Sequence, residues 1–160
     1  MAASTQPLST NLSWMLSHAS YTLTTELTAA LEQLGISPRA HCVLSAAATG
    51  EHTQTELAQM IGLDKTTLLV TLDELEAAGL AERRPSEKDR RVRVIAVTKA
   101  GESKLAEAEK IADRVQADVL EVLSPDERKV FVDALGRLVS DRLAKPVVCA
   151  HPVRRRAPRG

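Results

Sequence analysis

The chain has 160 residues, with 21 basic and 21 acidic side chains and 44% hydrophobic residues. This apolar content suffices for an ordered globular core, so the composition excludes a disordered protein. The longest apolar runs fall far short of the roughly 20 residues that a membrane-spanning helix needs. Residues 1–10 lack the basic and apolar regions of a secretory signal, and we therefore expect a cytoplasmic protein without a membrane segment.

Two cysteines, Cys42 and Cys149, form neither a disulfide framework nor a zinc-ligand pattern. The four histidines show no paired spacing on one helix, so we predict neither a metal site nor a cofactor. The zero net charge conceals one basic segment. Residues 82–99 hold seven basic and three acidic side chains, a local net charge of +4, which favours a polyanionic partner.

Apolar spacing predicts two helices at the start of the chain. Apolar residues recur every three or four positions over about 9–34, the pattern of an amphipathic helix, and Gly35 ends it. Ser37-Pro38 then provides an N-cap and a preset first turn for a second, buried helix that runs to Thr49-Gly50.

Two shorter helices follow, joined by a tight turn at Gly62-Leu63. Thr53 and Glu56 form a capping box that opens the third helix. Asp64 caps the fourth, which ends at Gly79 and has an inner face made of Leu68, Leu72 and Leu75. The pair is a helix-turn-helix candidate.

The pattern changes after Gly79. Residues 80–84 and 91–97 are extended and flank a turn-rich segment, which predicts a β-hairpin. From about Lys99 a helix carries a packing seam of Leu105, Ala108, Ala112, Val115, Val119 and Val122. The segment from Ser124 to Glu127 opens a last helix with an inner face of Val130, Phe131, Ala134, Leu135, Leu138 and Leu143. Residues 146–160, rich in proline and arginine, are expected to form a disordered basic tail.

A helix-turn-helix followed by an arginine-rich hairpin predicts a winged helix-turn-helix that divides DNA recognition between two grooves. The fourth helix would enter the major groove with its outward face, which carries Lys65, Thr66, Leu69 and Val70, with Thr67 at the boundary. The start of the third helix, Thr53, Gln54 and Thr55, is either a phosphate site or a plain helix cap. Arg39 and Arg83 are further phosphate candidates, unless each pairs with a nearby glutamate.

Taken in order, these features resemble the MarR family of bacterial transcription regulators. The resemblance covers about residues 10–143 and rests on Leu57-Ala58 with Gly62, on LDELEAAGL at 72–80 with Arg83, on Asp89-Arg90-Arg91, and on VTKAG at 97–101. It implies a mainly α protein that dimerises through helices from both ends (9–48 and 100–145) and binds DNA through a winged domain (49–99). It also implies a homodimeric repressor of a pseudo-palindromic operator, released by a small aromatic or anionic ligand.

The resemblance further implies roles for individual residues. Asp89 would orient Arg91 toward the minor groove, with Arg90 on a phosphate or sharing that role. A ligand pocket would involve Trp14, Met15, His18, Tyr21 and His41, residues that otherwise pack in a core or an interface. Peroxide-sensing relatives carry a reactive cysteine on the first helix, which this chain lacks. Cys42, among apolar residues, is expected to be a protonated and unreactive thiol.

The sequence contains no nucleophile with a base and orienting group, no glycine-rich phosphate loop and no carboxylate cluster, so we predict no enzyme. One alternative from another class stays open: a helical protein–protein interaction module whose winged domain does not bind specific DNA. On that alternative the basic wing meets an acidic surface of a partner protein. A separate interpretation of the wing alone is a solvated charge run with a surface ion pair.

Overall fold

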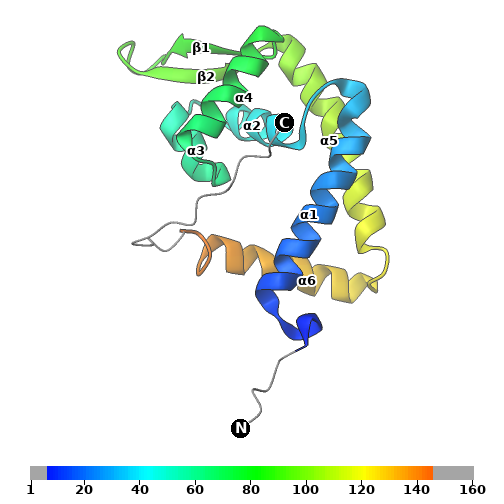
Figure 1. Ribbon diagram of the computed structural model, residues 1–160. Helices are drawn as coiled ribbons and strands as arrows, with labels where there is room; N and C mark the ends of the chain where they lie inside the picture. Colours follow the sequence, from blue (N-terminus) through cyan, green and yellow to red (C-terminus); the bar gives the residue numbers. More distant parts are fainter. Residues whose placement is uncertain (1–6, 146–160) are drawn as a thin grey trace, which may run out of the picture. The chain divides into compact units, whose positions relative to one another are not determined.

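The computed structural model describes residues 7–145, which are mainly helical with one two-stranded sheet (Figure 1). The helices are α1 (Leu12–Leu31), α2 (Pro38–Ala48), α3 (Gln54–Ile61), α4 (Lys65–Ala77), α5 (Lys99–Leu120) and α6 (Pro125–Ser140), with 3-10 turns at Leu8–Thr10 and Glu32–Leu34. The strands are β1 (Ala81–Pro85) and β2 (Arg93–Val97). The predicted fold class is confirmed, whereas the predicted basic tail lies outside the described residues.

The predicted caps define most of the helix ends. Thr53 with Glu56 and Ser124 with Glu127 form reciprocal capping boxes, and the Asp64 side chain accepts a hydrogen bond from the Thr67 amide. Left-handed glycines follow three of the helical segments: Gly35, Gly62 and Gly79, with φ of 66°, 67° and 68°.

Two predicted helix ranges need correction. The first helix, expected over 9–34, is a regular α-helix only from Leu12, because the Asn11 side chain caps it by accepting from the Trp14 amide. Its last turn tightens into the 3-10 segment Glu32–Leu34. The predicted packing seam also extended too far: α5 ends at Leu120, so Val122 lies in the following turn and is 88% exposed.

A single hydrophobic core joins α2, α3 and α4 to the hairpin, the end of α1 and the first half of α5. Its largest fully buried side chains are Leu31, Val43, Leu44, Leu57, Leu68 and Leu72. β1 and β2 pair antiparallel, with Ala81 opposite Val97 and Pro85 opposite Arg93. The amide of Ile95 also donates to the carbonyl of His52 at 2.9 Å. The segment before α3 is therefore hydrogen-bonded to β2.

The start of α5 is fixed against the end of α4. The Thr98 hydroxyl donates to the Gly79 carbonyl at 2.7 Å and accepts from the Gly101 amide at 3.0 Å. Gly101 lies so close to the backbone that an added Cβ would be 2.0 Å from the Leu80 carbonyl oxygen. Gly101 belongs to the VTKAG segment of the sequence, and the structure requires a glycine there for a close backbone approach.

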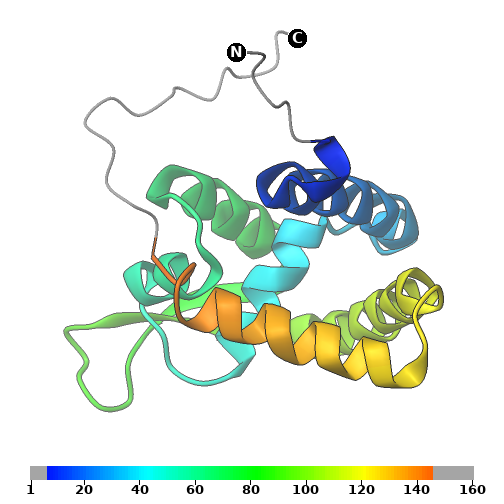
Figure 2. The same ribbon diagram turned by 90° about the horizontal axis from the view of Figure 1, so that it is seen from below.

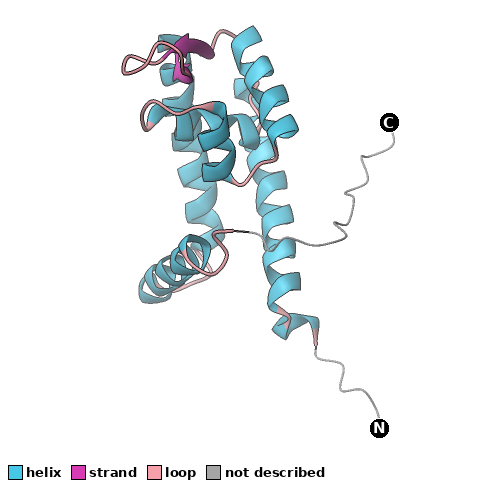
Figure 3. Ribbon diagram, turned by 90° about the vertical axis from the view of Figure 1, so that its left-hand side faces the viewer, coloured by secondary structure: helices cyan, strands magenta, loops and turns pink. Residues whose placement is uncertain are grey.

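The chain forms two compact units, one ending at Val119 and one beginning at Leu120. Within the first unit, α1 and α5 both extend away from the winged region (Figures 1 and 3). In the second unit, the predicted inner face of α6 is largely uncovered; Val130 is 67% exposed, and Phe131 and Leu138 are exposed too. None of the described helices is long and apolar enough to cross a membrane.

Candidate nucleic-acid interface

Helix α4 has one buried and one exposed face, as the sequence predicted. Leu68, Thr71, Leu72 and Leu75 are buried, whereas Lys65, Thr66, Leu69 and Val70 are exposed. These four side chains share one face because Lys65 and Leu69, Thr66 and Leu69, and Thr66 and Val70 are three or four residues apart. Thr67 is half-buried, and its hydroxyl donates to Asp64 Oδ2 at 2.6 Å, so this side chain serves the helix cap. The hydrogen bonds from Thr67 lower the pKa of Asp64.

The start of α3 is mainly a helix cap. The Thr53 hydroxyl and amide donate to Glu56 Oε2 at 2.8 and 2.7 Å, and the Glu56 amide returns a bond of 3.3 Å to the Thr53 hydroxyl. These bonds hold the pKa of the Glu56 carboxyl below its ordinary value. Gln54 is half-buried and Thr55 is exposed. The capping interpretation therefore accounts for Thr53 without a ligand, and only Thr55 presents an exposed hydroxyl.

The loop between β1 and β2, which we call the wing loop (86–92), projects away from α3 and α4 (Figure 2). Four exposed basic side chains lie on it or beside it: Lys88, Arg90, Arg91 and Arg93. Across residues 7–145, none of these four forms an ion pair. The wing loop and the first residue of β2 therefore present four cations that pair with no carboxylate of the described residues.

Asp89 contacts Arg91 through the backbone. Its Oδ1 accepts from the Arg91 amide at 2.9 Å, and its carbonyl accepts from the Val92 amide at 2.9 Å. The carboxylate thus orders the turn that carries Arg91. Within the described part of the chain, the Asp89 carboxylate forms no ion pair with the Arg91 guanidinium.

Arg83 is used inside the protein. Its guanidinium forms ion pairs with Glu76 and, at 2.8 Å, with Asp73, and its amide donates to Glu76 Oε1 at 2.8 Å. The alternative that Arg83 pairs with an acid is the arrangement observed, and it braces β1 against α4. Arg39, at the start of α2, is exposed and forms no ion pair within the described residues.

Sequence reasoning missed Glu51, which lies between α2 and α3 and contacts the wing loop. Its Oε2 accepts from the Ser86 hydroxyl at 2.7 Å and its Oε1 accepts from the Glu87 amide at 3.0 Å. Arg84 Nη2 lies 3.6 Å from the same Oε1. The bonds from Glu87 and Ser86 lower the pKa of Glu51 below its ordinary 4.5, so the carboxyl is ionised at neutral pH. The sequence gives no signal for this contact, because Glu51 and Ser86 are 35 residues apart and no local pattern links them.

The residues predicted for a ligand pocket are only partly brought together. Trp14 and His18 stack on α1, with ring centroids 5.0 Å apart. Met15 is exposed and Tyr21 is 74% exposed. His41 on α2 is half-buried, and its Nε2 is buried without a hydrogen-bond partner in the described structure. The 7–145 range contains no group of side chains that could hold a metal ion.

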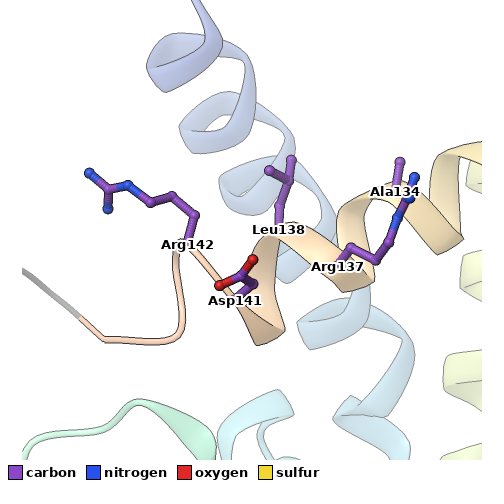
Figure 4. A pocket seen from close by; sticks show the side chains of 5 residues that line it. All are labelled: Ala134, Arg137, Leu138, Asp141 and Arg142. Atoms are coloured by element: carbon purple, nitrogen blue, oxygen red, sulfur yellow. The ribbon is translucent and has the colours of Figure 1, made fainter.

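Two shallow hollows lie along α6, and none of the five predicted pocket residues lines them. One is lined by Val130, Asp133 and Arg137. Figure 4 shows the other, lined by Ala134, Arg137, Leu138, Asp141 and Arg142. Both combine apolar and charged side chains of a single helix and its end, so neither is an enclosed ligand site.

For Cys42 the structure agrees with the predicted protonated thiol, whereas low reactivity stays a prediction. Although the residue is exposed in part, burial of the thiol raises its pKa above the ordinary 9.0. A raised pKa reduces the thiolate fraction at neutral pH, and the thiolate is the reactive form.

Comparison with known proteins adds three findings to this geometry. A model of the MarR family matches residues 34–92, the segment from the end of the first helical region through the helix-turn-helix into the wing loop. CouR from Rhodococcus jostii RHA1, solved bound to p-coumaroyl-CoA, is 28% identical with a TM-score of 0.78, over 91% of this chain and 99% of that chain. A MarR-family transcriptional regulator from Rhodococcus sp. RHA1 is 25% identical with a TM-score of 0.78, over 86% of this chain and 98% of its own.

Two further solved structures are similar to this chain, one with bound DNA and one without. The transcriptional repressor CouR bound to a 23-mer DNA duplex is 26% identical with a TM-score of 0.74, over 85% of this chain and 99% of that chain. Wild-type MarR from E. coli is 21% identical with a TM-score of 0.69, over 80% of this chain and 96% of its own, and shares the fold.

Proposed function

Because the resemblance of this chain to the MarR family is confirmed, we propose that it is a transcription regulator that binds specific double-stranded DNA, a homodimeric repressor acting on a pseudo-palindromic operator. One observation carries the proposal: the exposed face of α4 and the four basic side chains on or beside the wing loop, which form no ion pair within residues 7–145, belong to one packed domain. Either feature alone would be an ordinary protein surface. Together they match the two contacts that a winged helix-turn-helix makes with adjacent grooves.

The exposed face of α4 would read the major groove. Lys65 and Thr66 supply donors for phosphate oxygens or base acceptors near the start of the helix. Leu69 and Val70, 43% and 52% exposed, supply an apolar pair that contacts thymine methyl groups. The family often has a polar or basic residue near Val70, so this chain would depend more on methyl contacts for base discrimination.

The wing loop would supply the second contact. Arg91 and Arg90 are exposed, and the Asp89 carboxylate orders the turn that carries them. A narrow minor groove has an enhanced negative potential and attracts arginine side chains. We place Arg91 in that groove and Arg90 at its edge or on a phosphate.

The uncovered apolar side chains support a homodimer. Val130, Phe131 and Leu138 on α6 are exposed, as are Leu12, Trp14 and Met15 at the start of α1. Exposed apolar surfaces of this extent mark contact sites for other chains. Helices from both ends of the sequence would therefore form the dimer, with the winged domain between them in the chain.

The structure of CouR with p-coumaroyl-CoA supports a small-molecule effector for this chain as well. The Trp14–His18 stack and the unpartnered His41 Nε2 are the first places to look for an aromatic or anionic ligand. The proposal includes no catalysis, and it places the protein in the cytoplasm, together with its DNA.

The direct test is fluorescence-anisotropy binding to the DNA upstream of the gene and to a shuffled duplex, each over a series of salt concentrations. The proposal expects tighter binding to the upstream DNA at near-physiological salt. Equal binding to both duplexes that disappears with salt would overturn it and favour the protein–protein interaction module.

A pair of arginine variants tests the wing contact. Arg91→Ala should bind the upstream DNA roughly tenfold more weakly, because a good groove contact contributes about 1–3 kcal/mol. Arg114→Ala removes the same charge from an exposed position on α5 and should leave the affinity within about twofold. Equal affinities of the two variants would contradict the wing assignment. The dimer must be intact in both, as checked by size-exclusion chromatography.

A further inference from the structure

The contact between Glu51 and the base of the wing loop is formed by several donors on one carboxylate. The Ser86 hydroxyl and the Glu87 amide donate to different oxygens at 2.7 and 3.0 Å. The Arg84 guanidinium lies at 3.6 Å, and the Glu51 side chain is only 22% exposed. Hydrogen bonds to a charged acceptor are stronger than neutral ones. We call this arrangement the Glu51 latch.

The Glu51 latch connects the two halves of the winged domain. On one side, Glu51 is followed by His52, whose carbonyl accepts from Ile95 in β2, and by Thr53, the N-cap of α3. On the other side, Ser86 and Glu87 lie where β1 ends and the wing loop begins. The Ser86 hydroxyl also accepts from the Lys88 amide at 3.1 Å. The latch therefore fixes the first turn of the wing loop against the segment that leads into the helix-turn-helix.

We propose that Glu51 is a positioning residue for DNA binding, which holds the wing loop at the angle where Arg91 and the exposed face of α4 meet the duplex together. This inference rests on the proposed function and adds a role for an acidic side chain that does not touch DNA. Two contacts on one rigid body bind with less loss of conformational freedom than two contacts on independently moving parts. Loss of the latch would therefore weaken operator binding through the ordering cost of the wing loop.

The sign of the effect separates this role from simple electrostatics. A carboxylate near a DNA surface repels phosphates, so removing a surface acid should strengthen DNA binding and leave sequence preference unchanged. A positioning role predicts the opposite result on the operator. The shuffled duplex, which needs no fixed wing angle, should still bind the variant as tightly as the wild type or more tightly.

The experiment compares Glu51→Ala with Glu82→Ala by anisotropy on both duplexes. Glu82 is an exposed acid on β1 of the same hairpin and forms no ion pair within the described residues, so it is the matched charge control. Glu51→Ala should bind the upstream DNA about tenfold more weakly, the loss expected for hydrogen bonds to a charged group. Glu82→Ala should bind it as tightly as the wild type or more tightly. Equal affinities of the two variants for the upstream DNA would overturn the inference.

Two further variants keep the test decisive if Glu51→Ala unfolds. Ser86→Ala removes one donor and Glu51→Gln removes the charge, and each should weaken operator binding several-fold without loss of fold, as followed by circular dichroism. If Glu51→Ala folds, adding Ser86→Ala to it should cause less further loss than Ser86→Ala causes alone, because the contact between Glu51 and Ser86 is already broken and the bond from the Lys88 amide remains to be lost. Unchanged operator affinity in both single variants would also overturn the inference.

The inference and the proposed function fail in different ways. If the wild type prefers the upstream DNA and Glu51→Ala does too with the same affinity, only the latch is wrong. If the wild type shows no preference between the duplexes, the proposed function is wrong, and the latch has no operator to act on.

Discussion

Substituting Gly101 tests the junction between α4, the hairpin and α5. An alanine Cβ at this position would be 2.0 Å from the Leu80 carbonyl oxygen and 2.7 Å from Val97 Cγ1. The nearest atom belongs to the backbone, and the Leu80 carbonyl also accepts from the Thr98 amide at 3.1 Å, so it cannot move without breaking that bond. Overpacking of this kind costs about 1–3 kcal/mol, and a clash with backbone belongs at the upper end.

The expected loss follows from two opposing terms. Alanine is favoured over glycine in a helix by about 1 kcal/mol, which offsets part of the clash and leaves a net loss of roughly 2 kcal/mol in the free energy of unfolding. For a chain of this size each kcal/mol lowers Tm by about 2–4 °C, so Gly101→Ala should melt roughly 4–8 °C below the wild type.

Thermal unfolding followed by circular dichroism, at one fixed protein concentration, measures this difference. Gly136→Ala is the matched control, because Gly136 lies inside α6 and an added Cβ would meet nothing within 4 Å. This control should melt at a higher temperature than the wild type through helix propensity alone. A Tm for Gly101→Ala equal to or above that of the wild type would refute the close approach. A lower Tm for Gly136→Ala would show instead that a second chain packs against α6 at this position.

Two further predictions follow from the pKa shifts. Capping lowers the pKa of Glu56 and of Glu127 in the folded state, so each contributes stability above its ordinary pKa of 4.5, and this contribution is lost as the pH falls below it. The Tm of the wild type should therefore decrease below about pH 4.5, and the decrease should be smaller in a Glu56→Gln, Glu127→Gln double variant; identical pH profiles would contradict the capping contribution. Because burial raises the pKa of the Cys42 thiol, iodoacetamide should alkylate Cys42 in a Cys149→Ser variant more slowly at pH 7.5 than it alkylates free cysteine. An equal or faster rate would contradict the burial of this thiol, and mass spectrometry gives both rates.

The parts of the fold that the sequence predicts are those decided within a few residues. A capping box needs only a hydroxyl and a glutamate three positions apart, and both predicted boxes form. The buried face of α4 follows from apolar spacing alone, and Leu68, Leu72 and Leu75 are buried as predicted. The exposed face of the helix then follows by exclusion, so the candidate groove contacts on α4 could also be placed.

The contacts that the sequence does not predict join residues distant in the chain. Glu51 meets Ser86 across 35 positions, and Gly101 meets Leu80 through a backbone approach that no side-chain pattern records. Asp89 shows the same difficulty at short range. Its carboxylate accepts a hydrogen bond from the Arg91 amide. Aspartate side chains in turns commonly bind the backbone two residues further on, and the charge pattern of the sequence does not distinguish this bond from a contact with the arginine side chain.

The basic residues of the hairpin illustrate why a charge count alone misplaces a binding surface. Residues 82–99 contain seven cations, but Arg83 and Arg84 are neutralised by acids of α4, of the wing loop and of the segment before α3. These two arginines hold the hairpin in place. The cations at 88–93 follow the Glu51 latch in the chain and form no ion pair with the described residues. The Glu51 latch thus separates the arginines that are paired inside the hairpin from the basic side chains that remain for a polyanion. The number of unpaired basic side chains, more than the total number, determines where DNA would bind.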